Sequence, residues 1–347
     1  MVSKRFLAKR LLLLVPVLFG VATFVFGILH FAPGDPARII VGQRASAEQI
    51  QRVRAELGLN DPLWVQYLRF LGDAATFQFG ESYQISKGTP VREVVANTLP
   101  VTIELALYGQ FFGIGLGIPL GVLSAVKQDT LTDHATRIGA LTGISVPIYW
   151  SGPLLILFLS TQLGLFPASG RIGSTIFLDE SWRLLGTELP LTGLVTVDTL
   201  LLGNLDAFVS AVRHLLLPSL VIGIYSMALI SRMMRSSMLE VVRQDYMRTA
   251  RAKGQGAKIT VLKHGLRNAL IPVVTVVGIQ FGSLLGGAVL TETVFGIAGI
   301  GTMLVSAIGA TDYPLVQGTV LTFALLFTLV NLGVDVTYSY LDPRIEQ

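Results

Sequence analysis

The side chains best suited to chemistry are few and lie far apart in the chain. The sequence has no cysteine, and its four histidines, at positions 30, 134, 214 and 264, show no metal-ligand spacing such as His-Glu-x-x-His. It contains no Gly-Lys pair and so lacks the P-loop, whose lysine and backbone amides hold nucleotide phosphates. A Gly-x-Ser-x-Gly nucleophile turn is also missing. We therefore expect no catalytic residue, bound cofactor or metal site, and an intramembrane enzyme is a remote alternative.

The composition is that of a membrane protein. Of the 347 residues, 52% are hydrophobic and only 14% are charged, whereas soluble proteins carry about 25% charged residues. This composition excludes a soluble globule, a disordered chain, a coiled coil and a nucleic-acid-binding domain. The elements that position any functional side chain are therefore transmembrane helices, and the predicted fold class is an all-α polytopic membrane protein.

Six apolar stretches are long enough to cross a bilayer, which takes about 20 residues of helix. They are Leu11–Phe31, Leu99–Val126, Ile138–Leu163, Leu215–Ile230, Ala269–Leu290 and Leu315–Tyr338. A seventh stretch, Leu189–Leu205, is interrupted by Asp198 and Asn204. We expect it to be interfacial or re-entrant, with a spanning helix as the alternative. The first span reads as an uncleaved anchor rather than a signal peptide, because no small-x-small cleavage site follows it.

The distribution of basic residues predicts the orientation. Residues 232–267 carry nine lysines and arginines against two acids, and four basic residues precede the first span without an acid. Short basic segments stay in the cytoplasm. Both termini and the 232–267 loop are thus predicted to be cytoplasmic, in a multi-pass protein of the cell membrane. The net charge of +4 is explained by topology, and no nucleic-acid partner is needed.

This orientation divides the chain into an N-terminal anchor (1–31), an external segment (32–98) and a core of five further spans (99–347). The core contains an external insertion (164–213) and the cytoplasmic loop (232–267). In the external segment, Ser46 and Gln49 have the spacing of a capping box, which predicts a helix ending at Gly58. A second amphipathic helix is predicted over Leu63–Leu71. The external segment is therefore expected to be a folded cap.

Glycines recur at intervals of four residues in two of the spans. This spacing places them on one helix face, where another helix can approach closely. The partner is a span of this chain or of a second subunit. The glycines predicted to pack in this way are Gly109, Gly113, Gly117 and Gly121 in the second span, and Gly278, Gly282 and Gly286 in the fifth. Pro119, Pro147 and Pro272 can kink their spans.

Ionisable residues are sparse within the spans. Glu104 and Asp335 lie near the ends of theirs, so a structural role is favoured over a proton relay. Gln280 and Asn331 either line a transport path or bond to a neighbouring helix. No ladder of buried ionisable groups crosses the membrane, which argues against an ion-coupled secondary carrier.

The cytoplasmic loop has the most specific pattern. Residues 245–254 predict a short helix of good helix formers, ended by Gly254 and Gly256, and a second helical run leads into the fifth span. The loop resembles the EAA motif of ABC-importer permeases at Ala250, Gly254 and Leu266. It departs from the motif at Arg248, Thr249, His264 and Arg267, and these departures resemble the peptide-permease branch.

Further matches to that branch are found along nearly the whole chain. They are Phe31–Ala37, Thr192–Leu194, Gly278–Gly282, Glu292–Phe295 and Leu341–Ile345. The sequence is thus similar to the B-type membrane subunit of dipeptide, oligopeptide and nickel importers. The resemblance implies the transmembrane-domain fold of type I ABC importers.

The same resemblance implies a coupling helix that docks in a groove of a cytoplasmic ATPase. The residues it assigns to this coupling are Tyr246, Arg248, Thr249, Ala250, Arg251, Ala252, Lys253, Gly254 and Leu266, with the charged members at the rim. The implied partners are a sister permease, two ATPases that hold ATP and Mg²⁺, and an external solute-binding protein. The favoured substrate is a short peptide, and a nickel chelate, glutathione, an oligosaccharide or another small solute is the alternative.

Overall fold

The structure is a computed structural model that describes residues 4–31, 35–41, 45–179, 181–184 and 187–341. Within these ranges the chain is mainly helical, as predicted, with one short β-hairpin. Five helices are long and apolar enough to cross a membrane, and two bent helix pairs could add a span each. The family matches at Ala32–Gly34 and Asp342–Ile345 lie outside the described residues.

The elements follow one another in a simple order. The N-terminal and external part comprises α1 (Lys4–Phe31), α2 (Pro36–Val41), α3 (Ala47–Glu56) and α4 (Leu63–Ala75). The first half of the core comprises α5 (Val91–Val126), α6 (Leu131–Ser145), α7 (Ile148–Leu155), the π-helix η1 (Ile156–Gln162), β1 (Ser181–Leu184), β2 (Thr187–Pro190) and α8 (Val195–Leu201). The second half comprises α9 (Leu205–Val242), α10 (Asp245–Ala252), α11 (Ala257–Ile259), the π-helix η2 (Thr260–Gly265), α12 (Leu266–Phe295), α13 (Ile300–Gly309) and α14 (Tyr313–Leu341).

The third predicted span is not one straight helix. Helix α6 and the α7–η1 helix meet at an angle of 106°. The bend falls at Val146 and Pro147, where Val146 has an extended backbone (φ −81°, ψ 118°). The ring of a proline disfavours helical geometry in the residue before it. The apolar run Ile138–Leu163 therefore forms a broken span, and Pro147 is the residue that breaks it.

Two other helices are longer than the apolar stretches that predict them. Helix α9 has 38 residues, so the short fourth stretch is part of a longer helix that continues toward the cytoplasmic loop. Helix α12 extends to Phe295, and Gly296 ends it in a left-handed conformation (φ 60°). Helix α13 then turns away by 84°, and its ten residues were not predicted as an element.

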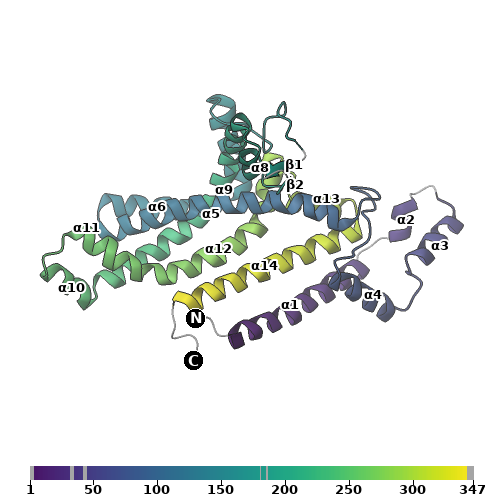
Figure 1. Cartoon of the computed structure of the whole chain (residues 1–347), viewed down its shortest axis with the longest axis horizontal. Helices are drawn as coiled ribbons and strands as arrows, with labels where there is room; N and C mark the ends of the chain where they lie inside the picture. The colour runs from purple at the N-terminus through teal and green to yellow at the C-terminus, as the bar shows by residue number, and fades with distance from the viewer. Residues whose placement is uncertain (1–3, 32–34, 42–44, 180, 185–186, 342–347) are drawn as a thin grey trace.

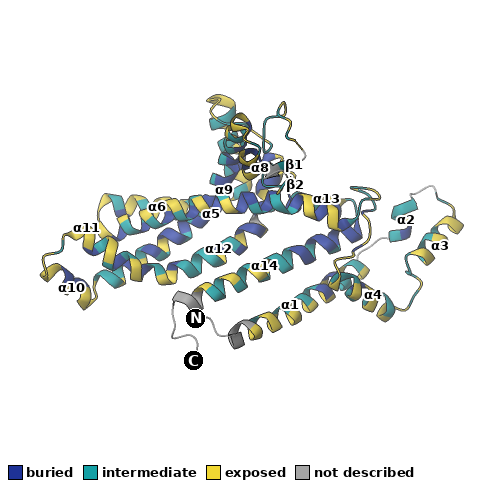
Figure 2. Ribbon diagram, viewed as in Figure 1, coloured by how far each residue is buried: buried dark blue, intermediate teal, exposed yellow. Residues whose placement is uncertain are grey.

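The two longest helices, α5 and α9, form the centre of the core. They run side by side over most of their length, and α12 packs against both (Figure 1). Buried residues concentrate on these helices, whereas α1 is largely exposed (Figure 2). Leu12 and Phe24 of α1 are 70% and 68% exposed, as expected for a peripheral helix that faces lipid.

The start of α1 and the end of α14 lie together. Arg10 and Asp335 form an ion pair with an Nη1–Oδ2 distance of 2.9 Å. Helix α1 runs away from this point toward the external segment, and α14 returns to it from that side. The pair joins the start of α1 to the end of α14, and Asp335 thus has the structural role that is favoured for it.

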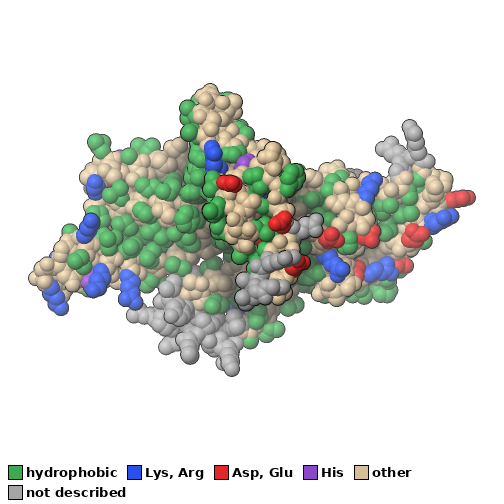
Figure 3. Space-filling view, turned by 45° about the horizontal axis from the view of Figure 1, so that its top comes forward, with side chains coloured by type: hydrophobic (Ala, Val, Ile, Leu, Met, Phe, Trp, Pro, Cys, Tyr) green, Lys and Arg blue, Asp and Glu red, His purple; other side chains and the backbone are tan. Residues whose placement is uncertain are grey.

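The predicted cytoplasmic loop and the predicted external cap occupy opposite ends of the long axis. On the face drawn in Figure 3, lysines and arginines stand at the end that carries α10 and α11, whereas acidic and basic side chains are mixed toward the other end. The surface between them is dominated by apolar side chains. This distribution agrees with the predicted orientation.

The external segment forms the helices that its helix-capping residues predict. Ser46 Oγ accepts a hydrogen bond from Gln49 N, and Gln49 Oε1 accepts one from Ser46 N, so the capping box of α3 is complete. Gly58 follows the helix with φ 65°. The second predicted helix is α4. The seventh apolar stretch contains α8, whose seven residues are too few to span a bilayer.

Candidate coupling site and transport path

Helix α10 presents one face to solvent and one to the rest of the chain. Met247 is fully buried and Ala250 is 9% exposed, whereas Tyr246 is 41% exposed. The other predicted coupling residues on the helix and its C-terminal turn are exposed, namely Arg248, Thr249, Arg251, Ala252, Lys253 and Gly254. Ala250 was expected at the docking contact, but its burial makes it a residue that holds the helix from within.

Gly254 ends the helix by its backbone conformation. Its φ is 80°, and a Cβ built on it would meet no atom within 4 Å. Only glycine adopts such an angle without steric cost. The position is therefore open to solvent, and the chain turns there toward α11.

The inner face of α10 is tied to the helices on either side of the loop. Met247 and Met238 of α9 both lie over Gly265, since a Cβ there would be 3.3 Å and 3.4 Å from their Cε atoms. Asn268 Nδ2 donates to Tyr246 Oη at 2.8 Å. Leu266 packs with Met238 in the same apolar cluster. Helix α10 is thus in contact with α9 and with the start of α12.

A second feature fixes α9 near this loop. Asp133, at the start of α6, is fully buried and accepts two hydrogen bonds from Arg235 of α9, both at 2.8 Å. Ser124 of α5 donates a further hydrogen bond to Asp133. Three helices therefore meet at one carboxylate, and a bidentate charged pair of this kind is among the strongest polar contacts in proteins.

The glycines of α5 form the contact with α9. A Cβ on Gly113 would lie 2.7 Å from Ser226 Oγ, and one on Gly117 would lie 2.9 Å from Met227 O. Gly109 meets Ile222, and Gly121 meets Met234 and the Ser231 carbonyl oxygen in the same way. The partner left open by the sequence is therefore a span of this chain.

Only two of the three predicted glycines of α12 make close contacts with another helix. Gly278 faces Val334 of α14, and a Cβ on Gly282 would lie 2.9 Å from Phe327 Cε2. A Cβ on Gly286 would meet nothing within 4 Å. The packing role predicted for Gly286 is thus not fulfilled within this chain, because α14 does not approach it.

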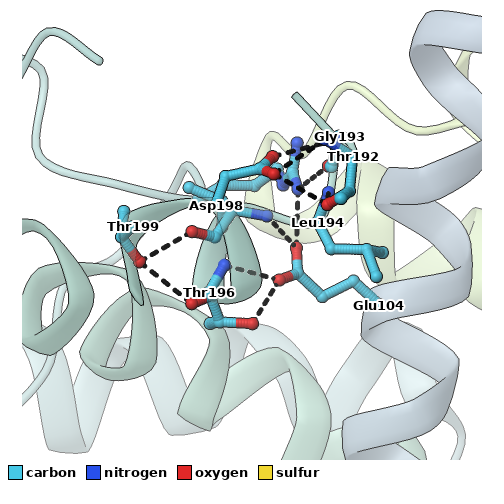
Figure 4. Close-up of polar contacts among 9 residues, drawn as sticks. Glu104, Thr192, Gly193, Leu194, Thr196, Asp198 and Thr199 are labelled. Atoms are coloured by element: carbon cyan, nitrogen blue, oxygen red, sulfur yellow. Dashed lines mark hydrogen bonds and ion pairs between the residues drawn. The ribbon is translucent and has the colours of Figure 1, made fainter. Parts of the chain in front are cut away.

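The intramembrane acid Glu104 is the centre of a buried polar cluster (Figure 4). Arg171 Nη2 lies 2.6 Å from Glu104 Oε2, and the backbone N–H and the hydroxyl of Thr196 donate to Oε1 at 2.8 Å and 2.6 Å. Asp198 accepts from the backbone of Thr192 and Gly193. These contacts fasten the external insertion to α5, so Glu104 is structural.

The comparisons with known proteins complete the assignment. The family of binding-protein-dependent transport system inner membrane components matches residues 117–347, and its N-terminal family matches residues 3–106. The chain belongs to this permease family. As a permease, it is a multi-pass transport subunit and not itself an enzyme.

The permease is similar to curated relatives over almost its full length. It is 44% identical to the dipeptide transport system permease proteins of Alkalihalophilus pseudofirmus (97% of this chain, 98% of the relative) and of Escherichia coli K12 (98% of both). It is 38% identical to the glutathione transport system permease protein of Escherichia coli O1:K1 (98% of both). The predicted dipeptide/oligopeptide branch of the ABC-importer permeases is thereby confirmed.

One solved structure shows the same fold. The inward-facing MetNI methionine ABC transporter superposes with a TM-score of 0.51 at 17% identity, covering 72% of this chain and 97% of that chain. At this identity the likeness concerns the fold alone. It confirms the type I importer transmembrane-domain architecture predicted for the permease.

The two predicted path residues of the permease lie in different surroundings. Gln280 is 6% exposed and lines a groove between α9 and α12. Its Nε2 atom is buried and has no hydrogen-bond partner in the part of the chain that the structure describes. Asn331 is half-buried on α14. A role in transport remains a prediction for both.

Three anchoring carboxylates of the permease have roles that the sequence did not indicate. Asp133 joins α6 to α9. Glu292 accepts hydrogen bonds from Thr102 of α5 and from the backbone of Thr302 (2.9 Å), and so fixes the corner between α12 and α13. Asp312 holds an external loop. Each bonds to residues remote in sequence or to loop backbone, and neither kind of partner leaves a spacing signal.

No group of three potential metal-binding His, Cys, Asp or Glu side chains is found among the described residues.

Proposed function

We propose that the chain is the membrane-spanning subunit of an ATP-driven importer of short peptides in the cell inner membrane. The proposal rests on the full-length identity of 44% to dipeptide transport permeases. It is supported by a loop helix that is exposed on one face and anchored on the other. Glutathione, itself a short peptide, is the second candidate substrate because a glutathione permease is 38% identical.

The proposed coupling surface is the exposed face of α10, with Tyr246 and Thr249 at its centre. Arg248, Arg251 and Lys253 surround it. A hollow of about 500 Å³ beside Tyr246 is lined by Lys263, His264, Arg267 and Asn268. An ATPase subunit would seat α10 in a groove and would meet these basic side chains with acidic ones.

The proposed cycle uses the connections of the loop. Two ATPases close on ATP and displace α10, and the displacement passes to α9 through Met247 and Met238 and to α12 through Gly265 and Asn268. Because α9 is packed on the glycines of α5 and bonded to α6, these helices move as a unit. Rigid-body rocking of such units alternates access between the two sides. A sister permease completes the path, and an external binding protein delivers the substrate.

Reconstitution tests the proposal. The chain is assembled with a sister permease and two ATPases in proteoliposomes, together with the binding protein, and uptake of a labelled dipeptide is measured. We expect uptake only with ATP, competed by dipeptides and less by nickel chelates or oligosaccharides. Uptake driven by an ion gradient without ATP would contradict the proposal and would favour a secondary carrier. Preferential competition by glutathione would select the second candidate substrate.

A further inference from the structure

A mainly apolar groove with three polar residues in its lining lies between α9 and α12, on the side of α9 that faces away from α5. The groove has a volume of about 410 Å³, and its lining includes the polar residues Arg232, Ser236 and Gln280 beside the apolar residues Leu229, Val276 and Ile279. Ile230 and Met234 of α9 pack on Gly117 and Gly121. Arg232 stands between them in sequence, and two residues along a helix correspond to about 200° of rotation. Its side chain is therefore directed away from the α5 contact.

Arg232 carries an unpaired charge. It is exposed, and it forms no ion pair or hydrogen bond within the part of the chain that the structure describes. Its neighbour Arg235, by contrast, is neutralised by Asp133. The nearest acid along this face of α9 is Glu240, eight residues or about 12 Å further along the helix. The guanidinium group is thus available to an anion.

The buried amide of Gln280 is a second, independent feature of the same groove. Its residue is 6% exposed, and its Nε2 donor has no partner among the described residues. A buried donor without a hydrogen-bond partner destabilises the fold. The Nε2 atom is itself buried, and because Gln280 lines the groove, a turn of its side chain would bring this donor to an acceptor bound beside Arg232.

A larger cleft adjoins this groove. It has a volume of about 760 Å³, lies between α6 and α9, and shares Arg232 and Ser236 with the groove. Arg232 therefore stands at the junction of two hollows. Its level is that of Gly117 and Gly121, near the C-terminal end of α5.

We propose that Arg232 and Gln280 form a binding site for the free carboxylate of the transported solute at the inner end of the path. A carboxylate accepts bidentate hydrogen bonds from a guanidinium group, and its second oxygen can accept from an amide. The site rests on the proposed function, since it assumes that this groove belongs to the path. It names the chemical feature that the path recognises, a free C-terminal carboxylate.

The test places a photo-crosslinker in the groove. Ile279 is 53% exposed and lines it, so benzoylphenylalanine at position 279 would label a bound ligand. The complete transporter, free of nucleotide and binding protein, is incubated with a labelled dipeptide. Unlabelled dipeptide and its C-terminal amide then compete for labelling. With Arg232 present, we expect the free acid to compete about tenfold or more better than the amide, since hydrogen bonds to charged groups contribute about 1.5–3 kcal/mol.

Variants of Arg232 show whether its guanidinium group causes the preference for the free acid. Arg232→Gln should abolish the preference for the acid, and Arg232→Lys should retain part of it. Arg243→Gln is the matched control, because Arg243 is an exposed arginine at the end of the same helix that lines only the larger cleft. It should keep the full preference.

Three results would overturn the site: an unchanged preference in Arg232→Gln, no labelling at position 279 in a transporter that is active with ATP, or displacement of the label by anionic lipid vesicles and not by peptide. The last would assign the groove to a lipid phosphate. Failure of the proposed function is distinct, because the unmodified complex would then show no ATP-driven peptide uptake at all.

Discussion

Asp133 and Arg235 form a two-point ion pair between the start of α6 and the inner part of α9. The two nitrogen–oxygen distances are both 2.8 Å, and the aspartate side chain is fully buried. Asp133→Asn would leave the guanidinium partly buried without its counter-charge. Removing one member of a buried pair typically costs about 3–5 kcal/mol. We expect a marked loss of thermal stability in detergent, measured by the fraction of monodisperse protein after heating.

A double variant separates the interaction energy of the ion pair from the effects of the two single substitutions. If the ion pair is responsible, Asp133→Asn with Arg235→Gln should be less destabilised than the sum of the single variants. Arg69 and Asp61 provide the control, since they also form an ion pair at 2.8 Å but are 52% and 40% exposed. Asp61→Asn should cost less than about 1 kcal/mol. Equal losses in the buried and exposed pairs would refute the anchoring role of Asp133.

The glycine face of α5 gives a prediction about folding. Leucine at Gly113 or Gly117 would place side-chain atoms where Ser226 and the Met227 carbonyl oxygen now lie within 3 Å. Helix α9 would have to move away along a contact that forms the centre of the core. We expect the yield of folded protein to fall sharply, as measured by size-exclusion chromatography of a fluorescent fusion.

Gly115 is the matched control for this experiment. It lies on the same helix, is exposed, and has nothing within 4 Å of a built Cβ. Gly115→Leu should therefore leave the yield unchanged, apart from the small gain in helix propensity that follows the loss of a glycine. A similar loss at Gly115 and Gly113 would show that glycine flexibility, rather than close packing, is what α5 requires.

The coupling turn gives a prediction about function. Gly254→Asp adds a carboxylate and a Cβ at a solvent-exposed position with φ 80°. A non-glycine residue in this region costs about 1–2 kcal/mol, and aspartate tolerates it better than most. We expect the variant to fold but to lose ATPase subunits during co-purification, and peptide uptake to fall in proportion.

Gly203→Asp is the control for the conformational cost of placing a non-glycine residue at a positive φ. Gly203 is also exposed, has φ 68° and has nothing within 4 Å of a built Cβ, but it lies in the turn between α8 and α9. Gly203→Asp should retain both the ATPases and uptake. Normal uptake in Gly254→Asp would count against a docking role for this turn.

The sequence predicted local features of the fold better than its tertiary contacts. Four-residue glycine spacing identified the packed face of α5, because one helix face can be read from its own residues. It could not identify α9 as the partner, and at Gly286 no helix of this chain approaches, which leaves a second subunit as the predicted partner there. Hydropathy located the third span and Pro147 marked the place of its break, but neither gave the angle of 106°. Helix α13 was missed because ten apolar residues are too few to register as a span.

The candidate coupling site shows the same difference between local features, which the sequence predicts, and tertiary contacts, which it does not. The loop pattern located α10 and the turn at Gly254, since both are set by short-range residues. Which face of α10 is exposed depends on Met238 and Gly265, and these lie on the helices before and after the loop. The burial of Ala250 could thus not be inferred from the motif. Asp133 and Arg235 are 102 residues apart in sequence, and no local rule pairs them.

The last prediction concerns acid and the external loop held by Asp312. Ser82 Oγ donates to Asp312 Oδ2 at 2.6 Å, and the backbone N–H groups of Tyr83, Gln84 and Ile85 donate to the same carboxylate at 2.9–3.2 Å. Burial by itself raises the pKa of Asp312, but these hydrogen bonds outweigh it and lower the pKa below the ordinary value of 3.8. They favour the ionised form, so they stabilise the folded loop only while the carboxylate is charged.

A lowered pKa in the folded state fixes the sign of the pH dependence. The stabilisation is complete above the unfolded-state pKa and is lost as the pH falls through the folded-state pKa. Hydrogen exchange of the amides at positions 83–85, corrected for intrinsic rates, should therefore stay slow from pH 6 to about pH 4 and accelerate below it. Asp312→Asn should exchange fast at every pH, because the amide cannot replace a charged acceptor of four donors. Asp179→Asn, at an exposed position, should behave as the unmodified chain. If protection of these amides survived in Asp312→Asn, the carboxylate would not be what holds this loop to the corner between α13 and α14.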